Sequence, residues 1–216
     1  MRVWRPAKVR AFLAATADDR LSGAYRLLLS TGMRRGELLG LRWGDVDLDA
    51  GRLTVRRTLI TTDVQRKGEP GYSWSEPKTK AGRRPIALDP DTVRVLREHR
   101  RRQAAERLAF GPGYADADLV VCEPDGSIIH PKTFSYRWER AVKQAGLQAI
   151  PVHSGRHTWA TLALEAGVNP RVVQERLGHA HVSITLGTYS HVDMSMQADA
   201  AARVAALVDG DSDAPR

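Results

Sequence analysis

The sequence of 216 residues predicts an α+β fold that is mainly helical and carries a small three-stranded antiparallel sheet. Most of the chain has apolar residues at helical spacing, with proline at expected helix starts and glycine at expected helix ends. One stretch, residues 53–88, changes to the shorter period of half-buried strands. No internal repeat interrupts this pattern, and the length is sufficient for one domain with a real core.

Three helices are expected before the strands. Residues 6–15 begin with Pro6, where the missing N–H costs nothing because the first turn of a helix has no partner for it. Residues 24–30 are strongly apolar, and Gly32 ends this second helix. A short third helix is expected over residues 37–41.

Three strands are then expected, over residues 53–58, 72–75 and 84–88. The first alternates apolar and polar side chains, as a half-buried strand does. Residues 77–83 are basic and separate the last two strands. We therefore expect one three-stranded antiparallel sheet with an exposed basic hairpin.

Helical patterns resume after the strands. Residues 91–108 carry an apolar face and an opposite face rich in arginine, which is either a solvated surface or a phosphate-contacting one. Residues 119–121 form a short apolar segment that we expect to be buried. Further helices are expected over residues 133–145, from the Asn169-Pro170 cap to Leu177, and over residues 194–208.

Composition limits the class of function. A formal net charge of +8 favours a polyanionic partner such as nucleic acid. Cys122 is the only cysteine, so no intrachain disulfide is possible and a reducing compartment is expected. The first residues lack the apolar segment of a signal peptide, and no apolar run has the roughly 20 residues of a membrane span. We expect a cytoplasmic protein that does not enter membranes.

One set of polar residues suits phosphoryl transfer. Two arginines can bind the non-bridging oxygens of a phosphodiester and match its growing negative charge. Histidines can donate to the same oxygens or accept the proton of a tyrosine nucleophile, and a lysine can protonate the leaving 5′-oxygen. The candidates are Arg34, Arg156, His153, His179, Lys78 and Tyr189. Because no acidic cluster accompanies them, we expect neither a metal nor another cofactor.

These residues lie in five short motifs, and together they resemble the tyrosine recombinase (phage integrase) family in order and spacing. The motifs are Thr31-Gly32-Met33-Arg34-Arg35-Gly36-Glu37, Pro77-Lys78-Thr79-Lys80 followed by Arg83-Arg84, His153-Ser154-Gly155-Arg156, Leu177-Gly178-His179 and Thr188-Tyr189. The interval of 10 positions from His179 to Tyr189 also suits the family.

The resemblance implies a role for each residue. Arg34 and Arg156 would bind the scissile phosphate, and His179 would hydrogen-bond it. His153 would serve acid–base chemistry at Tyr189, which would form a 3′-phosphotyrosyl intermediate with DNA. Lys78 would protonate the leaving oxygen, with Lys80 as the alternative, and Glu37 would support Arg34. From the charge pattern of the basic hairpin and the arginine-rich helix face, the residues expected to contact DNA are Lys80, Arg83, Arg84, Arg100 and Arg101.

The third motif departs from the family at Gly155, where leucine is usual. Glycine near a helix start removes a packing group and adds backbone freedom. We expect this change to affect stability and the alignment of Arg156 more than the chemistry.

The resemblance also implies domains and partners. Residues 1–208 would form the catalytic domain, and residues 209–216 an acidic, disordered tail. The N-terminal DNA-binding domain that family members usually carry would be absent from this chain. The expected partner is double-stranded DNA with a specific recombination site, bound by a homotetramer whose neighbours exchange a C-terminal element. Residues 194–208 are the candidate for this element, and the alternative is a helix that packs on its own domain.

Three alternatives stay open at this point. His153 and His157 have the i, i+4 spacing of a zinc site, although no glutamate follows His153 as a zincin motif requires. A DNA-binding module that keeps the fold without activity would have the same charge. A type IB topoisomerase would share the chemistry but relax supercoils instead of exchanging strands.

Overall fold

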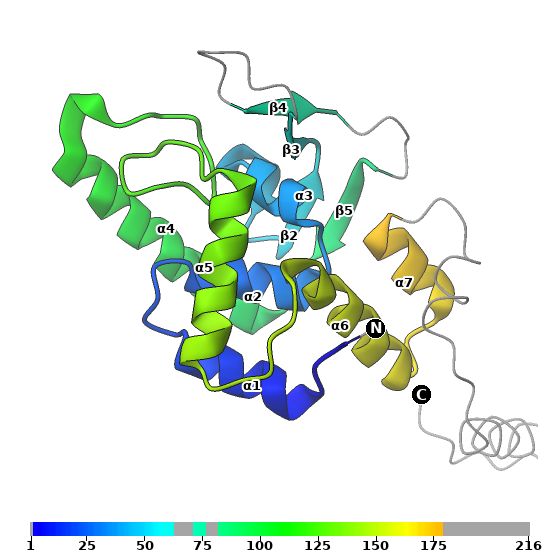
Figure 1. Ribbon diagram of the computed structural model, residues 1–216. Coiled ribbons are helices and arrows are strands. Elements are labelled where there is room, and N and C mark those ends of the chain that lie inside the picture. Colours follow the sequence, from blue (N-terminus) through cyan, green and yellow to red (C-terminus); the bar gives the residue numbers. More distant parts are fainter. Residues whose placement is uncertain (1, 63–70, 77–81, 179–216) are drawn as a thin grey trace, which may run out of the picture.

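The computed structural model describes residues 2–62, 71–76 and 82–178. This part of the chain folds into seven α-helices, five short strands and two 3₁₀ turns (Figure 1). The expected helix over residues 194–208, the tail over 209–216, and Lys78, Lys80, His179 and Tyr189 lie outside the described residues.

Six of the seven helices lie close to the ranges that the sequence predicts, whereas the helix over Val152–Glu165 has no predicted range of its own. The helices are α1 (Pro6–Ala15), α2 (Ser22–Thr31), α3 (Arg35–Gly40), α4 (Pro90–Phe110), α5 (Pro131–Gln144), α6 (Val152–Glu165) and α7 (Pro170–Leu177). Proline opens α1 as expected, and the side chain of Asn169 caps α7 by accepting a hydrogen bond from the backbone N–H of Arg171 at 2.8 Å. The 3₁₀ turns are η1 (Trp43–Asp45) and η2 (Gly111–Gly113). The mainly helical fold that the sequence predicts is confirmed.

The strands form two small antiparallel sheets. The first has three strands in the order β1 (Val46–Asp47), β2 (Arg52–Val55) and β5 (Arg84–Ala87), and the second pairs β3 (Thr58–Thr61) with β4 (Tyr72–Ser75). A small three-stranded antiparallel sheet is therefore confirmed, but its expected membership is wrong. The strand expected over residues 53–58 is divided, and residues 72–75 pair with β3 and not with β5.

Two arginines account for the division between β2 and β3. Arg56 forms an ion pair with Asp45 at 2.8 Å. The Nε of Arg57 donates to the carbonyl oxygen of Gly40 at 2.7 Å, and its guanidinium lies 4.6 Å from the ring centroid of Trp74. The first ladder ends at Val55 and the second begins at Thr58, and these contacts hold the two residues between them outside both ladders.

An aromatic cluster fixes the position of α6. Trp4 lies fully buried and stacks on Trp138 of α5, with 5.6 Å between ring centroids. The indole N–H of Trp138 donates to the carbonyl oxygen of Ile150 at 2.8 Å, directly before α6 begins. The backbone N–H of Trp4 donates to Oγ1 of Thr158 inside α6 at 3.1 Å. The core therefore holds the helix that carries His153 and Arg156.

Helix α2 lies between α4 and α6 (Figure 1). The buried side chain of His99 in α4 packs against Gly23 of α2. Nδ1 of His99 lies 3.1 Å from the guanidinium of Arg102, which can only donate, so Nδ1 accepts and the Nε2 proton is donated to the carbonyl oxygen of Val120 at 2.7 Å. Burial lowers the pKa of His99, and the positive charges of Arg102 and Arg20 lower it further. His99 is therefore held neutral.

This burial predicts a pH dependence of stability. The unfolded chain binds a proton at His99 below about pH 6.5, whereas the folded state resists it, so the free energy of unfolding should decline as the pH falls through that value. Urea unfolding at several pH values should show a smaller decline for His99→Gln, even if this variant is less stable at pH 7. The double variant His153→Gln/His157→Gln removes two further imidazoles with lowered pKa values, so it should reduce the decline separately and leave the part that is due to His99. Parallel curves for wild type and His99→Gln would contradict the assignment.

In the part of the chain that the structure describes, no helix combines the length and the apolarity needed to cross a membrane.

Candidate active site

The first motif begins where α2 ends at a left-handed glycine. Gly32 has φ of 67°, a conformation that side chains disfavour. A Cβ atom at this position would lie 2.8 Å from a methyl carbon of Leu177 and 3.0 Å from the ring of Trp159. Only glycine therefore allows the end of α2 to approach both α6 and α7. The chain turns here and begins α3 directly after Arg34.

Arg34 is bound to a buried carboxylate. One guanidinium nitrogen of Arg34 donates to Oε1 of Glu37 at 2.9 Å, and the backbone N–H of Arg34 donates to Oε2 at 2.8 Å. The second bond caps the start of α3, because Glu37 stands at its third position. The side chain of Glu37 is 3% exposed, whereas that of Arg34 is 42% exposed. Glu37 thus fixes the orientation of Arg34 and leaves its guanidinium accessible.

A second arginine binds the same carboxylate. Two guanidinium nitrogens of Arg84 in β5 donate to the two oxygens of Glu37 at 3.0 and 2.9 Å. Burial alone would raise the pKa of Glu37, but the hydrogen bonds and charges of Arg84 and Arg34 outweigh it and hold the pKa below its ordinary value. Glu37 is therefore ionised at neutral pH.

Arg156 connects two of the sequence motifs. Its side chain is almost fully buried in α6. Its two terminal nitrogens donate to the carbonyl oxygen of Gly32 at 3.0 Å and to that of Leu177 at 2.7 Å. These bonds fix the plane of the guanidinium and join the first motif to the end of α7. The Leu177 carbonyl belongs to the residue two positions before His179.

His153 lies one turn before His157 at the start of α6, with 4.6 Å between the two ring centroids. Partial desolvation lowers the pKa of His153, and the positive charges of Arg156, Arg34 and Arg35 lower it further. Desolvation and the neighbouring His153 and Arg156 lower the pKa of His157 to about 4. Both imidazoles are therefore neutral at pH 7, and the arginines of two motifs act on the same histidine.

Gly155 is packed tightly against α2. A Cβ atom at this position would lie 3.0 Å from Cδ2 of Leu28 and 3.6 Å from Cδ2 of Leu29. The space that a leucine side chain at position 155 would need is therefore occupied by Leu28. The glycine at position 155 therefore allows the close packing of α6 against Leu28 of α2.

This packing predicts that Gly155→Leu destabilises the protein by about 1–3 kcal/mol, because the added side chain overfills the contact with Leu28. Leu28→Ala alone should also destabilise, by about 2–5 kcal/mol, because it leaves a cavity. Urea unfolding should show that the double variant loses less free energy of unfolding than the two single variants lose together. Simple addition of the losses would show that the two positions do not share this space.

Of the basic residues expected to contact DNA, the structure describes Arg83, Arg84, Arg100 and Arg101, and these four do not gather in one place. Arg83 is exposed and forms an ion pair with Glu76 at 2.7 Å. Arg84 is only 5% exposed and is bound to Glu37, so its assignment to an exposed DNA-contacting surface is corrected: its guanidinium points into the protein. The signal for this was present in the sequence, because alternation along a strand places Arg84 on the same face as the buried Ile86.

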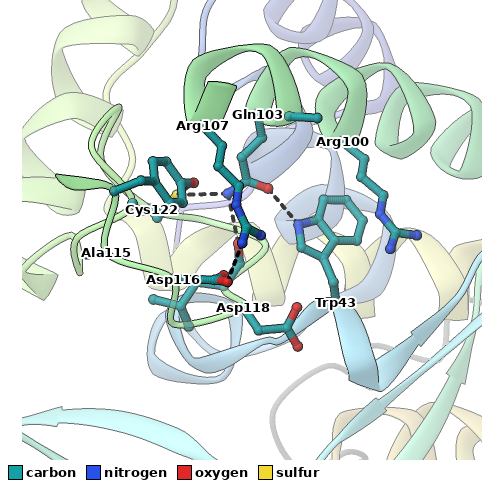
Figure 2. Close-up of a pocket in the computed structure, with 12 residues that line it drawn as sticks. Trp43, Arg100, Gln103, Arg107, Ala115, Asp116, Asp118 and Cys122 are labelled. Carbon is teal, nitrogen blue, oxygen red and sulfur yellow. Dashed lines mark hydrogen bonds and ion pairs between the residues drawn. The ribbon is translucent and has the colours of Figure 1, made fainter. Parts of the chain in front are cut away.

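Arg100 and Arg101 are exposed on α4, whose C-terminal half lies at the other end of the molecule from α7 (Figure 1). Figure 2 shows Arg100 beside Trp43, at a small pocket of about 150 Å³. The guanidinium of Arg100 lies 5.1 Å from the centroid of the Trp43 ring. These two arginines are not brought together with Arg34 and Arg156, and their contact with DNA stays a prediction.

Arg176 in α7 is a residue of this region that the sequence analysis does not single out. Its carbonyl oxygen accepts a bond from Nε of Arg84 at 2.6 Å. Its own guanidinium donates to the carbonyl oxygens of Ser30 at 3.1 Å and Ala87 at 2.9 Å and lies 4.9 Å from the ring of Trp159. Arg176 therefore connects α7 to α2 and β5 through hydrogen bonds. No local pattern in the sequence indicates these contacts, because they join distant segments.

Residues 2–62, 71–76 and 82–178 contain no group of three or more His, Cys, Asp or Glu side chains placed to hold a metal ion. Arg34, Glu37, Arg84, His153 and Arg156 do come together there, and the accessible guanidinium of Arg34 can bind an anion near the neutral imidazole of His153. Lys78, Lys80, His179 and Tyr189 lie outside the described residues, so their roles stay predictions.

Comparison with known proteins places the chain among integrases. The tyrosine recombinase XerC-like protein of Caldanaerobacter subterraneus subsp. tengcongensis is 34% identical over 191 residues, which are 86% of this chain and 49% of that protein. The ICEBs1 integrase of Bacillus subtilis is 26% identical over 93% of this chain and 53% of its own length. The chain thus spans about half the length of these curated relatives.

Solved structures share the fold. The Tn1549 transposon integrase, in complex with transposon right end DNA, matches 94% of this chain and 66% of its own with a TM-score of 0.79 and 24% identity. The XerA recombinase matches 94% of this chain and 65% of its own with a TM-score of 0.72 and 22% identity. The model of the phage integrase family matches residues 3–196, which is most of the sequence. The chain belongs to the phage integrase family.

Proposed function

We propose that this chain is the catalytic domain of a site-specific DNA recombinase that cuts and rejoins DNA through a covalent 3′-phosphotyrosyl intermediate. The observation that carries the proposal is the convergence of Arg34 from the first motif with His153 and Arg156 from the third. Among the described residues, the carboxylate bound to Arg34 is that of Glu37, and the positive charge of Arg84 offsets its negative charge. This site suits a phosphodiester, whose negative charge grows during attack.

The reaction would proceed in two balanced steps. The hydroxyl oxygen of Tyr189 attacks the phosphorus, and the bond from phosphorus to the 5′-oxygen breaks. His153 is neutral at pH 7 and suits the role of proton acceptor for the tyrosine. Lys78, or Lys80 in its place, supplies a proton to the leaving 5′-oxygen. A 5′-hydroxyl from another strand then attacks the phosphotyrosine and restores a phosphodiester and free Tyr189.

The two arginines would supply the charge stabilisation in both steps. Arg156 is held in a fixed plane by two carbonyl oxygens, and Arg34 is held by Glu37. Preorganised donors of this kind need no rearrangement as charge develops. Because the intermediate conserves the energy of the phosphodiester bond, the cycle would need neither ATP nor a metal ion.

The experiment uses nicked duplexes, in which the short strand beyond the cleavage site diffuses away and traps the covalent intermediate. A pool of duplexes with randomised sequence, incubated with the protein in excess chelator, should yield a protein–DNA adduct that survives denaturing electrophoresis. Sequencing of the trapped DNA identifies the preferred site. An adduct that requires added metal would contradict the mechanism, and binding without any adduct would indicate a DNA-binding module.

The proposal includes the partners and the location. Double-stranded DNA with a specific site is supported by the net charge of +8 and by the DNA-bound Tn1549 integrase structure. Assembly as a tetramer on DNA and action in the cytoplasm are proposed with it. Sedimentation of the protein with the DNA recovered above tests the assembly, since four protein chains should sediment with two duplexes. Relaxation of a supercoiled plasmid without strand exchange would favour a type IB topoisomerase.

A further inference from the structure

The carboxylate of Glu37 is shared by two arginines with unequal exposure. Oε1 accepts from guanidinium nitrogens of Arg34 at 2.9 Å and Arg84 at 3.0 Å. Oε2 accepts from the backbone N–H of Arg34 at 2.8 Å and from Arg84 at 2.9 Å. Arg84 and Glu37 are 5% and 3% exposed, whereas Arg34 is 42% exposed. The buried pair thus lies behind a single accessible cation.

The charges of this cluster do not cancel. Arg34, Glu37 and Arg84 carry one positive, one negative and one positive charge, so the three together carry +1. Without Arg84, the pair of Arg34 and Glu37 would be neutral, and the buried carboxylate would have Arg34 as its partner within this cluster. An anion approaching Arg34 would then compete with Glu37 for it. Arg84 therefore lets Glu37 orient Arg34 without neutralising it.

The backbone of Arg84 is held by the pairing of β5 with β2, and its side chain is held by α7. It pairs with Val55 at the first position of β5, directly after the segment that carries Lys78 and Lys80. Its Nε donates to the carbonyl oxygen of Arg176 in α7 at 2.6 Å. Arg84 thus joins β5 and α7 to the carboxylate that orients Arg34.

We propose that Arg84 is a positioning residue for DNA cleavage, which offsets the charge of Glu37 so that Arg34 is both oriented and available to the scissile phosphate. This inference rests on the proposed function. A purely structural role for Arg84 would predict only a loss of stability. This inference also predicts that removing the carboxylate of Glu37 restores part of the cleavage rate that is lost with Arg84.

The cleavage test compares Arg84→Met, Glu37→Gln and the double variant on the trapped nicked duplex. Arg84→Met should lower the rate of adduct formation at saturating DNA by about 10- to 100-fold, the usual effect of removing a residue that orients a catalytic group. The double variant should be faster than Arg84→Met, because a neutral amide no longer competes for Arg34. If Arg84 only stabilises the fold, the double variant should cleave as slowly as Arg84→Met or more slowly. That result would overturn the inference.

Arg20 offers a matched control away from the site. It also makes two bonds to a glutamate, Glu106, at 2.7 and 2.6 Å, and a third to the carbonyl oxygen of Cys122 at 2.5 Å. Arg20→Met should lower the melting temperature without this loss of cleavage rate. An equal loss of cleavage in Arg20→Met and Arg84→Met would assign both effects to stability.

A second measurement separates this inference from the proposed function. Titration with inorganic phosphate, followed through the ¹⁵N signal of Arg34 Nε, reports anion binding without cleavage. Arg84→Met should bind phosphate several-fold more weakly than wild type, and the double variant should regain part of the affinity. This pattern without any DNA adduct from wild type would refute the recombinase proposal, and it would retain only the inference that Arg84 keeps Arg34 available to an anion. Unchanged phosphate affinity in folded Arg84→Met would refute that role.

Discussion

Arg156→Lys is expected to lower the rate of covalent DNA cleavage by about 100- to 1000-fold, the usual effect of losing a preorganised donor to a developing negative charge. The guanidinium of Arg156 bonds the carbonyl oxygens of Gly32 and Leu177 with two separate nitrogens, at 3.0 and 2.7 Å. A lysine ammonium is a point charge and cannot reproduce this planar arrangement. The substitution therefore keeps the charge but loses its fixed orientation and the link between α2 and α7.

The measurement is the single-turnover rate of adduct formation on the nicked duplex, with thermal unfolding to confirm that the variant is folded. Arg137→Lys is the matched control, because Arg137 also uses two nitrogens to bind a pair of oxygens, those of Glu123 at 2.9 and 2.8 Å. This control should cleave at close to the wild-type rate. Near-normal cleavage by folded Arg156→Lys would remove Arg156 from the proposed site.

Tyr189→Phe is expected to abolish the covalent adduct while DNA binding is retained, since the variant loses only the nucleophilic oxygen. The chain has four other tyrosines. Tyr25 is buried, and desolvation raises its pKa, which makes its hydroxyl a poor nucleophile. Tyr136 on α5 is 66% exposed, so Tyr136→Phe tests whether an accessible tyrosine substitutes.

Denaturing electrophoresis measures the adduct, and a mobility-shift assay measures binding of the same DNA. Tyr136→Phe should form the adduct at the wild-type level. An adduct formed by Tyr189→Phe at a comparable level would show that another residue is the nucleophile.

The helices could be predicted because their signals are local. Proline at the start of α1 and α5, the Asn169 cap of α7 and the left-handed Gly32 at the end of α2 all act within one turn of the helix they delimit. The apolar spacing between these signals is likewise a property of the segment itself. These signals depend on the local sequence and not on contacts with distant parts of the chain.

The division of the strands depends on contacts between distant residues and could not be predicted in the same way. Arg57 leaves the ladder to bind the carbonyl of Gly40 and the ring of Trp74. The approach of β3 to α3 also needs Gly36, because a Cβ atom there would clash with the carbonyl oxygen of Leu59. Alternation within residues 53–58 carries no information on either contact.

The site shows the same contrast. The motifs predict Arg34, His153 and Arg156 as individual residues, and these do come together. The inward direction of Arg84 follows from strand alternation, but its pairing with Glu37 depends on how β5 packs against α3. Motif spacing could therefore indicate the chemistry without showing how the charge of Arg34 is kept available.

Mapping the covalent bond between protein and DNA tests the central claim most directly. Cleavage after lysine and arginine would release residues 177–203 as one peptide, in which Tyr189 is the only tyrosine. Mass spectrometry of the nuclease-trimmed adduct should find a nucleotide attached to Tyr189 through its 3′-phosphate, with a 5′-hydroxyl on the released strand. A 5′-linkage, or attachment to a different residue such as Ser190, would contradict the proposed mechanism.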